Sequence, residues 1–230
     1  MVAWLRRLVF SAACAGLLTG LLATLAHQIA TVPVILEAEV YEQAAPAAAH
    51  ALPGTAHDHE AHAWQPRDGV ERIGFTALAD ILTAIGYGLL LTAAFALLER
   101  DVTWRAGLWW GLAGFATFTL APGLGLPPEV PGTPAAPLLD RQLWWVATAL
   151  ATGGGLALLA FGRTWVWPVL AVALIALPHL WGAPQPPEYG GAAPAALGHQ
   201  FVIAVTLVSF LSWTVLGGST AYFYQRFNRL

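Results

Sequence analysis

The amino-acid sequence predicts an all-α integral membrane protein with six transmembrane helices and a long histidine-rich outer loop between the first two. Of the 230 residues, 57% are hydrophobic and 10% are charged, whereas soluble domains carry about 25% charged residues. The mean hydropathy is +0.62. Six apolar segments reach or approach the roughly 20 residues that a helix needs to cross a bilayer. We therefore expect residues 1–230 to form a single polytopic membrane domain.

The six apolar segments, in chain order, are residues 8–30, 73–98, 104–121, 142–161, 166–181 and 200–224. The third and fifth are the shortest, so five helices are the main alternative, with residues 166–181 re-entrant or the first segment cleaved as a signal peptide. The first segment is longer than the apolar region of an ordinary signal peptide. Its length favours a retained first helix.

The arginine residues predict the orientation of these helices. The chain contains no lysine, and all ten of its basic residues are arginine. With the N-terminus inside, seven of the ten lie at cytoplasmic ends, namely Arg6, Arg7, Arg100, Arg105, Arg163, Arg226 and Arg229. Ten of the 13 acidic residues fall on the outer side. The positive-inside rule therefore predicts that both termini lie in the cytoplasm. We expect the membrane to be a bacterial inner membrane.

The long outer loop, residues 31–72, contains a cluster of potential metal ligands. Its alanine-, proline- and histidine-rich part, residues 44–64, is of low complexity and is expected to be disordered. The cluster comprises His50, His57, Asp58, His59, Glu60 and His62. No regular backbone presents His57, His59 and His62 on one face. We interpret the cluster as a capture loop rather than a preorganised site; a chance scatter of histidines is the alternative.

A second group of candidates lies near the outer ends of the helices and predicts a path for a metal ion. The group comprises His27, Asp80, Glu129, His179 and His199. His27 continues a face that begins with Gly16 and Gly20, a spacing typical of close helix packing. Asp80 would lie roughly 10 Å below the outer end of its helix. An ionisable residue at such a depth in the membrane indicates function. The alternatives are a carbonyl-bound His27, and an Asp80 that pairs with Arg72 or Arg141 or makes a packing hydrogen bond.

Two proline-rich stretches, residues 120–132 and 177–191, are expected to be irregular and to hold Glu129 and His179 at the mouth of a cavity. Ordinary connecting segments are the alternative for both. Histidine and carboxylate groups together suit divalent first-row metals, so cobalt, nickel and zinc all fit. The net charge of −3 argues against a nucleic-acid partner. No phosphate-binding loop is present, so we expect no ATP hydrolysis by this chain.

Four stretches resemble one known family, the CbtA-type cobalt transporter subunits. They are "WQPRDGVERIGFT" (64–76), "LAPGLGLPPEVPG" (120–132), "RQLWW" (141–145) and "PHLWGAPQP" (178–186). The resemblance implies uptake of the cobalt ion as substrate, in support of cobalamin synthesis. It also implies a small single-span partner, CbtB, with a histidine-rich end. Family members are usually given five spans, one fewer than the count above.

The sequence therefore favours a cobalt uptake subunit that uses no organic cofactor. The main alternative is a non-transporting membrane scaffold or sensor that binds metal through its loop. A membrane enzyme is disfavoured because no catalytic base and nucleophile lie close together in the sequence.

Overall fold

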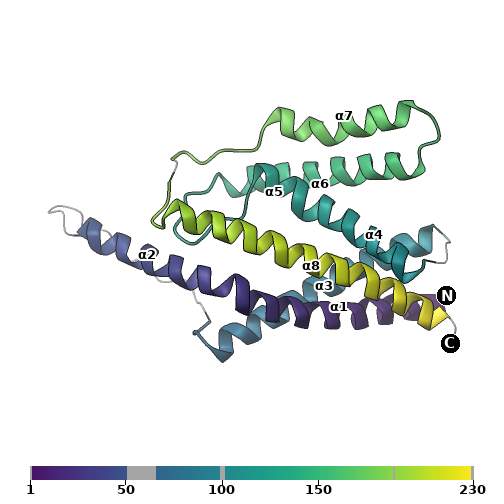
Figure 1. Cartoon of the computed structure of the whole chain (residues 1–230), viewed down its shortest axis with the longest axis horizontal. Coiled ribbons are helices and arrows are strands. Elements are labelled where there is room, and N and C mark those ends of the chain that lie inside the picture. The colour runs from purple at the N-terminus through teal and green to yellow at the C-terminus, as the bar shows by residue number, and fades with distance from the viewer. Residues whose placement is uncertain (1, 51–65, 99–101, 189, 229–230) are drawn as a thin grey trace.

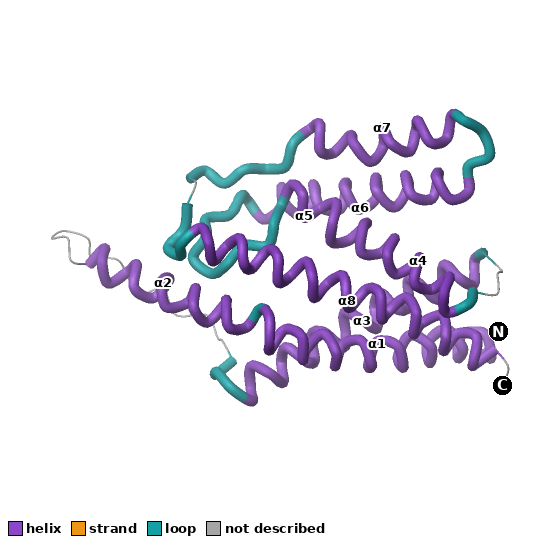
Figure 2. Tube along the Cα trace, viewed as in Figure 1, coloured by secondary structure: helices purple, strands orange, loops and turns teal. Residues whose placement is uncertain are grey.

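The computed structural model describes residues 2–50, 66–98, 102–188 and 190–228, and within them the regular elements are helices (Figures 1 and 2). In chain order these are α1 (Val2–Ala30), α2 (Val32–His50), α3 (Val70–Leu97), α4 (Trp104–Phe115), the π-helical segment η1 (Ala116–Leu120), α5 (Ala121–Gly125), α6 (Leu138–Phe161), α7 (Val166–Trp181) and α8 (Ala195–Asn228). The long helices lie roughly side by side, and the labelled termini are at the same end of the bundle (Figure 1).

Four helices are long and apolar enough to cross a membrane, and α7 is a shorter apolar helix. The four are Trp4–Ala30, Val70–Leu97, Leu138–Phe161 and Ala195–Asn228. These five helices contain, to within one residue, five of the predicted segments. The remaining segment forms the continuous run of α4, η1 and α5, which a π-helical turn interrupts. The all-helical prediction is confirmed, and the chain is a multi-pass membrane protein.

The first part of the expected outer loop is helical, and residues 44–50, which were expected to be disordered, belong to that helix. α2 continues α1 across Thr31, whose amide donates to the carbonyl of His27 at 3.0 Å and whose carbonyl accepts from the amide of Ile35 at 3.0 Å. α2 has 19 residues and therefore extends roughly 28 Å beyond α1 at 1.5 Å per residue. The ligands His57, Asp58, His59, Glu60 and His62 lie outside the described residues.

The proline-rich stretch after the third segment is also partly helical, against expectation, since α5 contains Pro122. Proline has no amide proton and clashes with the carbonyl four residues earlier in a regular α-helix. The π-helical turn that precedes Pro122 changes the hydrogen-bond register at this point. The helix can therefore continue to Gly125, and irregular backbone begins only beyond it.

α1 packs against both α3 and α8. Gly16 and Gly20 make the contact with α3 possible. A Cβ atom on Gly16 would lie 2.5 Å from Ile85, and one on Gly20 would lie 2.5 Å from the Cα atom of Ile81. At the end near the termini, Arg7 Nε donates to the carbonyl of Tyr224 on α8 at 2.9 Å. Removal of α1 would therefore remove much of the core.

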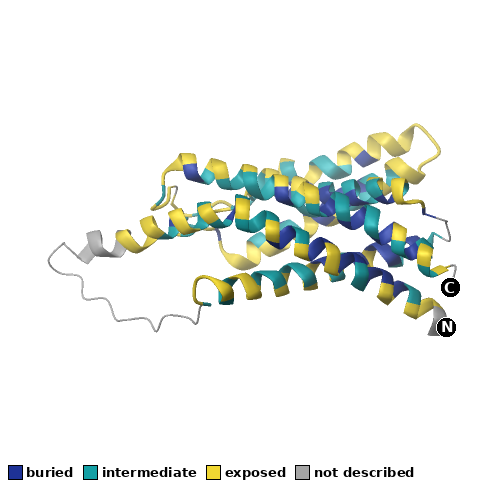
Figure 3. Cartoon of the chain, turned by 60° about the horizontal axis from the view of Figure 1, so that its bottom comes forward, coloured by how far each residue is buried: buried dark blue, intermediate teal, exposed yellow. Residues whose placement is uncertain are grey.

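The other helices form further layers (Figure 1). α4 packs against α8 through Gly107, Gly111 and Gly217, and α6 packs against α7. Burial concentrates where α1, α3, α4 and α8 meet, whereas α7 buries only Ala171 and Pro178 (Figure 3). α7 is thus the most peripheral of the five apolar helices, and α1 and α3 provide the close packing on which the candidate site depends.

We expect the substitution Gly20→Ala to lower the stability of the protein. The added methyl group meets the backbone of α3, and overpacking of this kind costs about 1–3 kcal/mol. Thermal unfolding of the purified protein in detergent measures the effect. Gly86→Ala on α3 is the matched control, because a Cβ atom there meets nothing within 4 Å. Equal melting temperatures for the two variants would contradict the packing argument.

Candidate functional site

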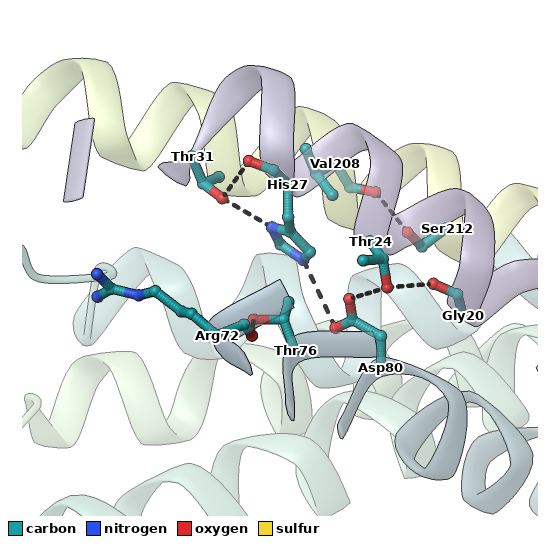
Figure 4. Close-up of polar contacts among 9 residues, drawn as sticks. All are labelled: Gly20, Thr24, His27, Thr31, Arg72, Thr76, Asp80, Val208 and Ser212. Atoms are coloured by element: carbon teal, nitrogen blue, oxygen red, sulfur yellow. Dashed lines mark hydrogen bonds and ion pairs between the residues drawn. The ribbon is translucent and has the colours of Figure 1, made fainter. Parts of the chain in front are cut away.

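The structure brings together two ionisable side chains that the sequence analysis placed among the helices. His27 on α1 faces Asp80 on α3, with 3.9 Å between His27 Nε2 and Asp80 Oδ1 (Figure 4). The side chains are 27% and 18% exposed, respectively. Gly16 and Gly20 lie further along the same face of α1, so the close packing of α1 and α3 continues directly into this pair.

A buried threonine fixes one oxygen of the Asp80 carboxylate. Thr24 Oγ1 lies 2.9 Å from Asp80 Oδ2 and also 2.9 Å from the carbonyl oxygen of Gly20. Its single hydroxyl proton serves these two acceptors. The other carboxylate oxygen, Oδ1, faces His27. Burial of Asp80 is thus compensated in part by a hydrogen bond and in part by the imidazole.

Thr31 contacts the His27 ring at its other nitrogen. The Thr31 hydroxyl donates to the carbonyl of His27 at 3.2 Å, and the same oxygen lies 2.9 Å from His27 Nδ1. Which of the two groups donates at Nδ1 depends on the tautomer of the ring. In the neutral tautomer with its proton on Nδ1, that nitrogen donates to Thr31 and Nε2 presents its lone pair to the Asp80 carboxylate.

In that tautomer, the Nε2 lone pair and the carboxylate oxygen Oδ1 together form a site for a cation. The 3.9 Å separation is too long for a direct hydrogen bond. Divalent zinc binds imidazole nitrogen and carboxylate oxygen at about 2.0–2.2 Å each, so an ion of this size fits between the two atoms. A proton on Nε2 would also relieve the repulsion. The pair supplies two protein ligands, and a bound metal ion would need water or further groups to complete its coordination.

The remaining candidates on the helices do not join this pair. Within the described part of the chain, no three His, Cys, Asp or Glu residues are grouped so that they could hold a metal ion. His179 on α7 packs edge-on against Trp144, with ring centroids 5.7 Å apart. His199 is exposed in the first turns of α8. His50 is the last residue of α2.

Glu129 lies in the segment between α5 and α6, where Arg141 Nη2 is 3.7 Å from Glu129 Oε2. A cation bound to Glu129 would meet the guanidinium charge. Two unit charges 4 Å apart repel by about 4 kcal/mol at an effective dielectric constant near 20, and a divalent ion doubles this value. The geometry therefore favours Asp80 over Glu129 as a metal ligand.

Neither arginine that the sequence analysis considered as a partner for Asp80 takes that position. Arg72 forms an ion pair with Glu39 on α2 and another with Asp68, the latter at 2.8 Å. Thr24 and Thr31, which sequence reasoning missed, make the polar contacts of the pair. Their spacing offered a signal, because they stand three residues before and four residues after His27, on the same helical face.

Comparisons with known proteins point to one family. A family model described as "Probable cobalt transporter subunit (CbtA)" matches residues 5–225, nearly the whole chain. No curated protein and no solved structure matches the chain.

The position of the His27 proton is testable by nitrogen NMR of the histidine-labelled protein. In the neutral ring we expect protonated Nδ1 and unprotonated Nε2, because the Thr31 hydroxyl donates to the carbonyl of His27 and its oxygen is then free to accept from Nδ1. Thr31→Val removes that acceptor and should produce a mixture of tautomers. Thr31→Ser keeps the hydroxyl and should leave the wild-type spectrum. Protonated Nε2 in the neutral wild-type ring would contradict the assignment.

Proposed function

Because the chain belongs to the CbtA family of probable cobalt transporter subunits, we propose that it takes up cobalt and that the ion passes between His27 and Asp80. The single observation that carries this proposal is the approach of the His27 imidazole to the Asp80 carboxylate in the interior of the bundle. A nitrogen and an oxygen ligand suit divalent first-row metals. Two protein ligands hold an ion less tightly than a complete site, which suits passage more than storage.

We further propose six membrane crossings, with both termini in the cytoplasm of a bacterial cell. α4, η1 and α5 have 12, 5 and 5 residues, so their continuous run is roughly 33 Å long. This length matches a hydrocarbon core of about 30 Å. α7 is then the shortest crossing, and successive helices run through the membrane in alternating directions. The distribution of the arginine residues supports this orientation.

The outer surface is proposed to collect the metal. α2 carries Glu37, Glu39 and Glu42, and its end leads into the histidine-rich capture loop that contains His57, Asp58, His59, Glu60 and His62. His179 and His199 stand at the same end of the bundle, at the end of α7 and the start of α8. We propose that they act as intermediate binding sites for the metal ion between the loop and the His27–Asp80 pair.

The proposal includes the metal, the partner and the metabolic role. Cobalt is the substrate, and nickel or zinc fits the same nitrogen and oxygen ligands, so selectivity would rest on geometry or supply. The chain would act without an organic cofactor and without catalysis. Its partner would be a small single-span, histidine-rich CbtB-type subunit, and the imported cobalt would support cobalamin synthesis.

Uptake of radiolabelled cobalt by cells tests the His27–Asp80 pair. We expect Asp80→Asn and His27→Gln each to lower the uptake rate at least tenfold, because each removes one ligand while it preserves much of the side-chain size. Asp68→Asn is the matched control: it removes a carboxylate next to the same helix, at a side chain that is 75% exposed. Near-normal uptake in both pair variants would reject the proposed path.

The capture loop has a different expected signature in the same assay. Deletion of residues 44–64 should raise the cobalt concentration needed for half-maximal uptake and leave the maximal rate nearly unchanged. A loop that only concentrates the ion changes the local cobalt concentration and not the rate at which bound ions cross the membrane. Loss of the maximal rate in a stable, membrane-inserted deletion variant would show instead that the loop belongs to the path.

Flux into liposomes separates transport from metal sensing. Purified protein should carry cobalt across the bilayer, alone or together with its small partner. Binding of cobalt without any flux in either preparation would favour a non-transporting scaffold or sensor.

A further inference from the structure

A cavity of about 850 Å³ lies at the outer end of the bundle, away from the His27–Asp80 pair. It is bounded by η1, α5, the segment after α5, the beginning of α6 and the beginning of α8. A divalent ion with six water molecules occupies roughly 200 Å³, at about 30 Å³ per water. The cavity is therefore several times larger than a hydrated ion, and lies within the size range of sites for small organic molecules.

Two opposite charges stand in this cavity, and within the described residues neither has a hydrogen-bond partner in the protein. Glu129 and Arg141 both line it, with side chains that are 30% and 35% exposed. Their closest approach of 3.7 Å exceeds a hydrogen bond. Within the described residues, neither side chain donates or accepts a hydrogen bond. Half-buried charged groups are normally hydrogen-bonded, so this pair has donors and acceptors available for a ligand.

The backbone that carries the two charges is fixed in place. Next to Glu129, the side chain of Val130 is buried against Ala38 and Leu197. Two residues further on, the carbonyl of Gly132 accepts a hydrogen bond of 3.4 Å from the amide of Ala192. One turn after Arg141, the buried Trp144 donates from Nε1 to the carbonyl of Pro178 at 3.2 Å. The backbone positions of the two charged residues are therefore held before any ligand binds, which lowers the cost of ordering the site.

The combination of charges selects the ligand class. A divalent cation is repelled by Arg141, and a simple anion is repelled by Glu129. A zwitterion satisfies both groups at once. The rest of the lining is largely apolar, with Phe118, Leu120, Leu124, Trp145, Val146 and Val202 among its residues. An organic molecule with an apolar portion therefore fits better than a hydrated ion.

We propose that this cavity binds an organic zwitterion, with its anionic group against Arg141 and its ammonium group against Glu129. Two sources share this chemistry: a phospholipid with an ethanolamine head group, whose chains would follow the apolar wall, and a free apolar α-amino acid. The inference does not depend on cobalt transport, because the cavity and the His27–Asp80 pair use different residues.

Binding to the purified full-length protein in detergent tests the proposal. Native mass spectrometry measures retention of phosphatidylethanolamine against phosphatidylglycerol, which lacks the ammonium group. Equilibrium dialysis measures radiolabelled leucine. We expect one of the two zwitterions to bind, and Arg141→Ala and Glu129→Gln each to weaken it at least tenfold. Retention of phosphatidylethanolamine identifies the lipid source, and binding of leucine identifies the amino acid.

Three controls make the result decisive. Arg67→Ala removes an outer arginine whose side chain is 91% exposed and should leave binding unchanged, as should Asp80→Asn. Arg141→Lys keeps the charge and should retain more binding than Arg141→Ala, and the melting temperature of each variant checks its folding. The proposal is overturned if neither zwitterion binds, if both phospholipids bind equally, or if the cavity variants bind like the wild type.

Discussion

Direct backbone contact between α1 and α3 is the constraint on which the rest of the structure depends. The contact exists because Gly16 and Gly20 have no Cβ atoms to collide with α3. Close approach at these glycines lets the short side chain of Thr24 reach Asp80 at 2.9 Å. An aspartate at the centre of a transmembrane helix costs about 2.5–3.5 kcal/mol on insertion scales. Thr24 and His27 compensate part of that cost, and they reach Asp80 because α1 and α3 pack closely. The same helix packing therefore also stabilises a charged side chain in the interior.

Much of the fold was predictable from hydrophobic length and charge placement, and the errors have identifiable causes. α7 has the predicted bounds, because its apolar run ends at Trp181 and Gly182 follows at a φ of 93°. Residues 32–50 were assigned to the outer loop, and residues 44–50 to its low-complexity part, which was expected to be disordered. Alanine has the highest helix propensity, however, and Pro33 stands in the first turn of α2, where proline is tolerated. Composition thus gave too little weight to the six alanines of α2.

The sequence predicted only part of the candidate site. Helical spacing predicted correctly that His27 shares a face with Gly16 and Gly20, and depth identified Asp80. Their meeting could not be predicted, because the two residues are 53 positions apart and only the packing of α1 on α3 brings them together. Glu129 and Arg141 are closer in sequence, but the backbone between them is irregular and has no period from which to infer proximity. Local sequence patterns therefore identified the ionisable residues but not the residues that they contact.

The joint between α1 and α2 has a mechanical consequence. Thr31 forms this joint, and its side chain is also the partner of His27. α2 extends roughly 28 Å from the joint, so a bend of 10° at Thr31 would move its tip by about 5 Å. The ion pair between Glu39 and Arg72 restrains this arm near its middle. A small change of backbone angle at Thr31, next to His27, would therefore be amplified at the far end of α2.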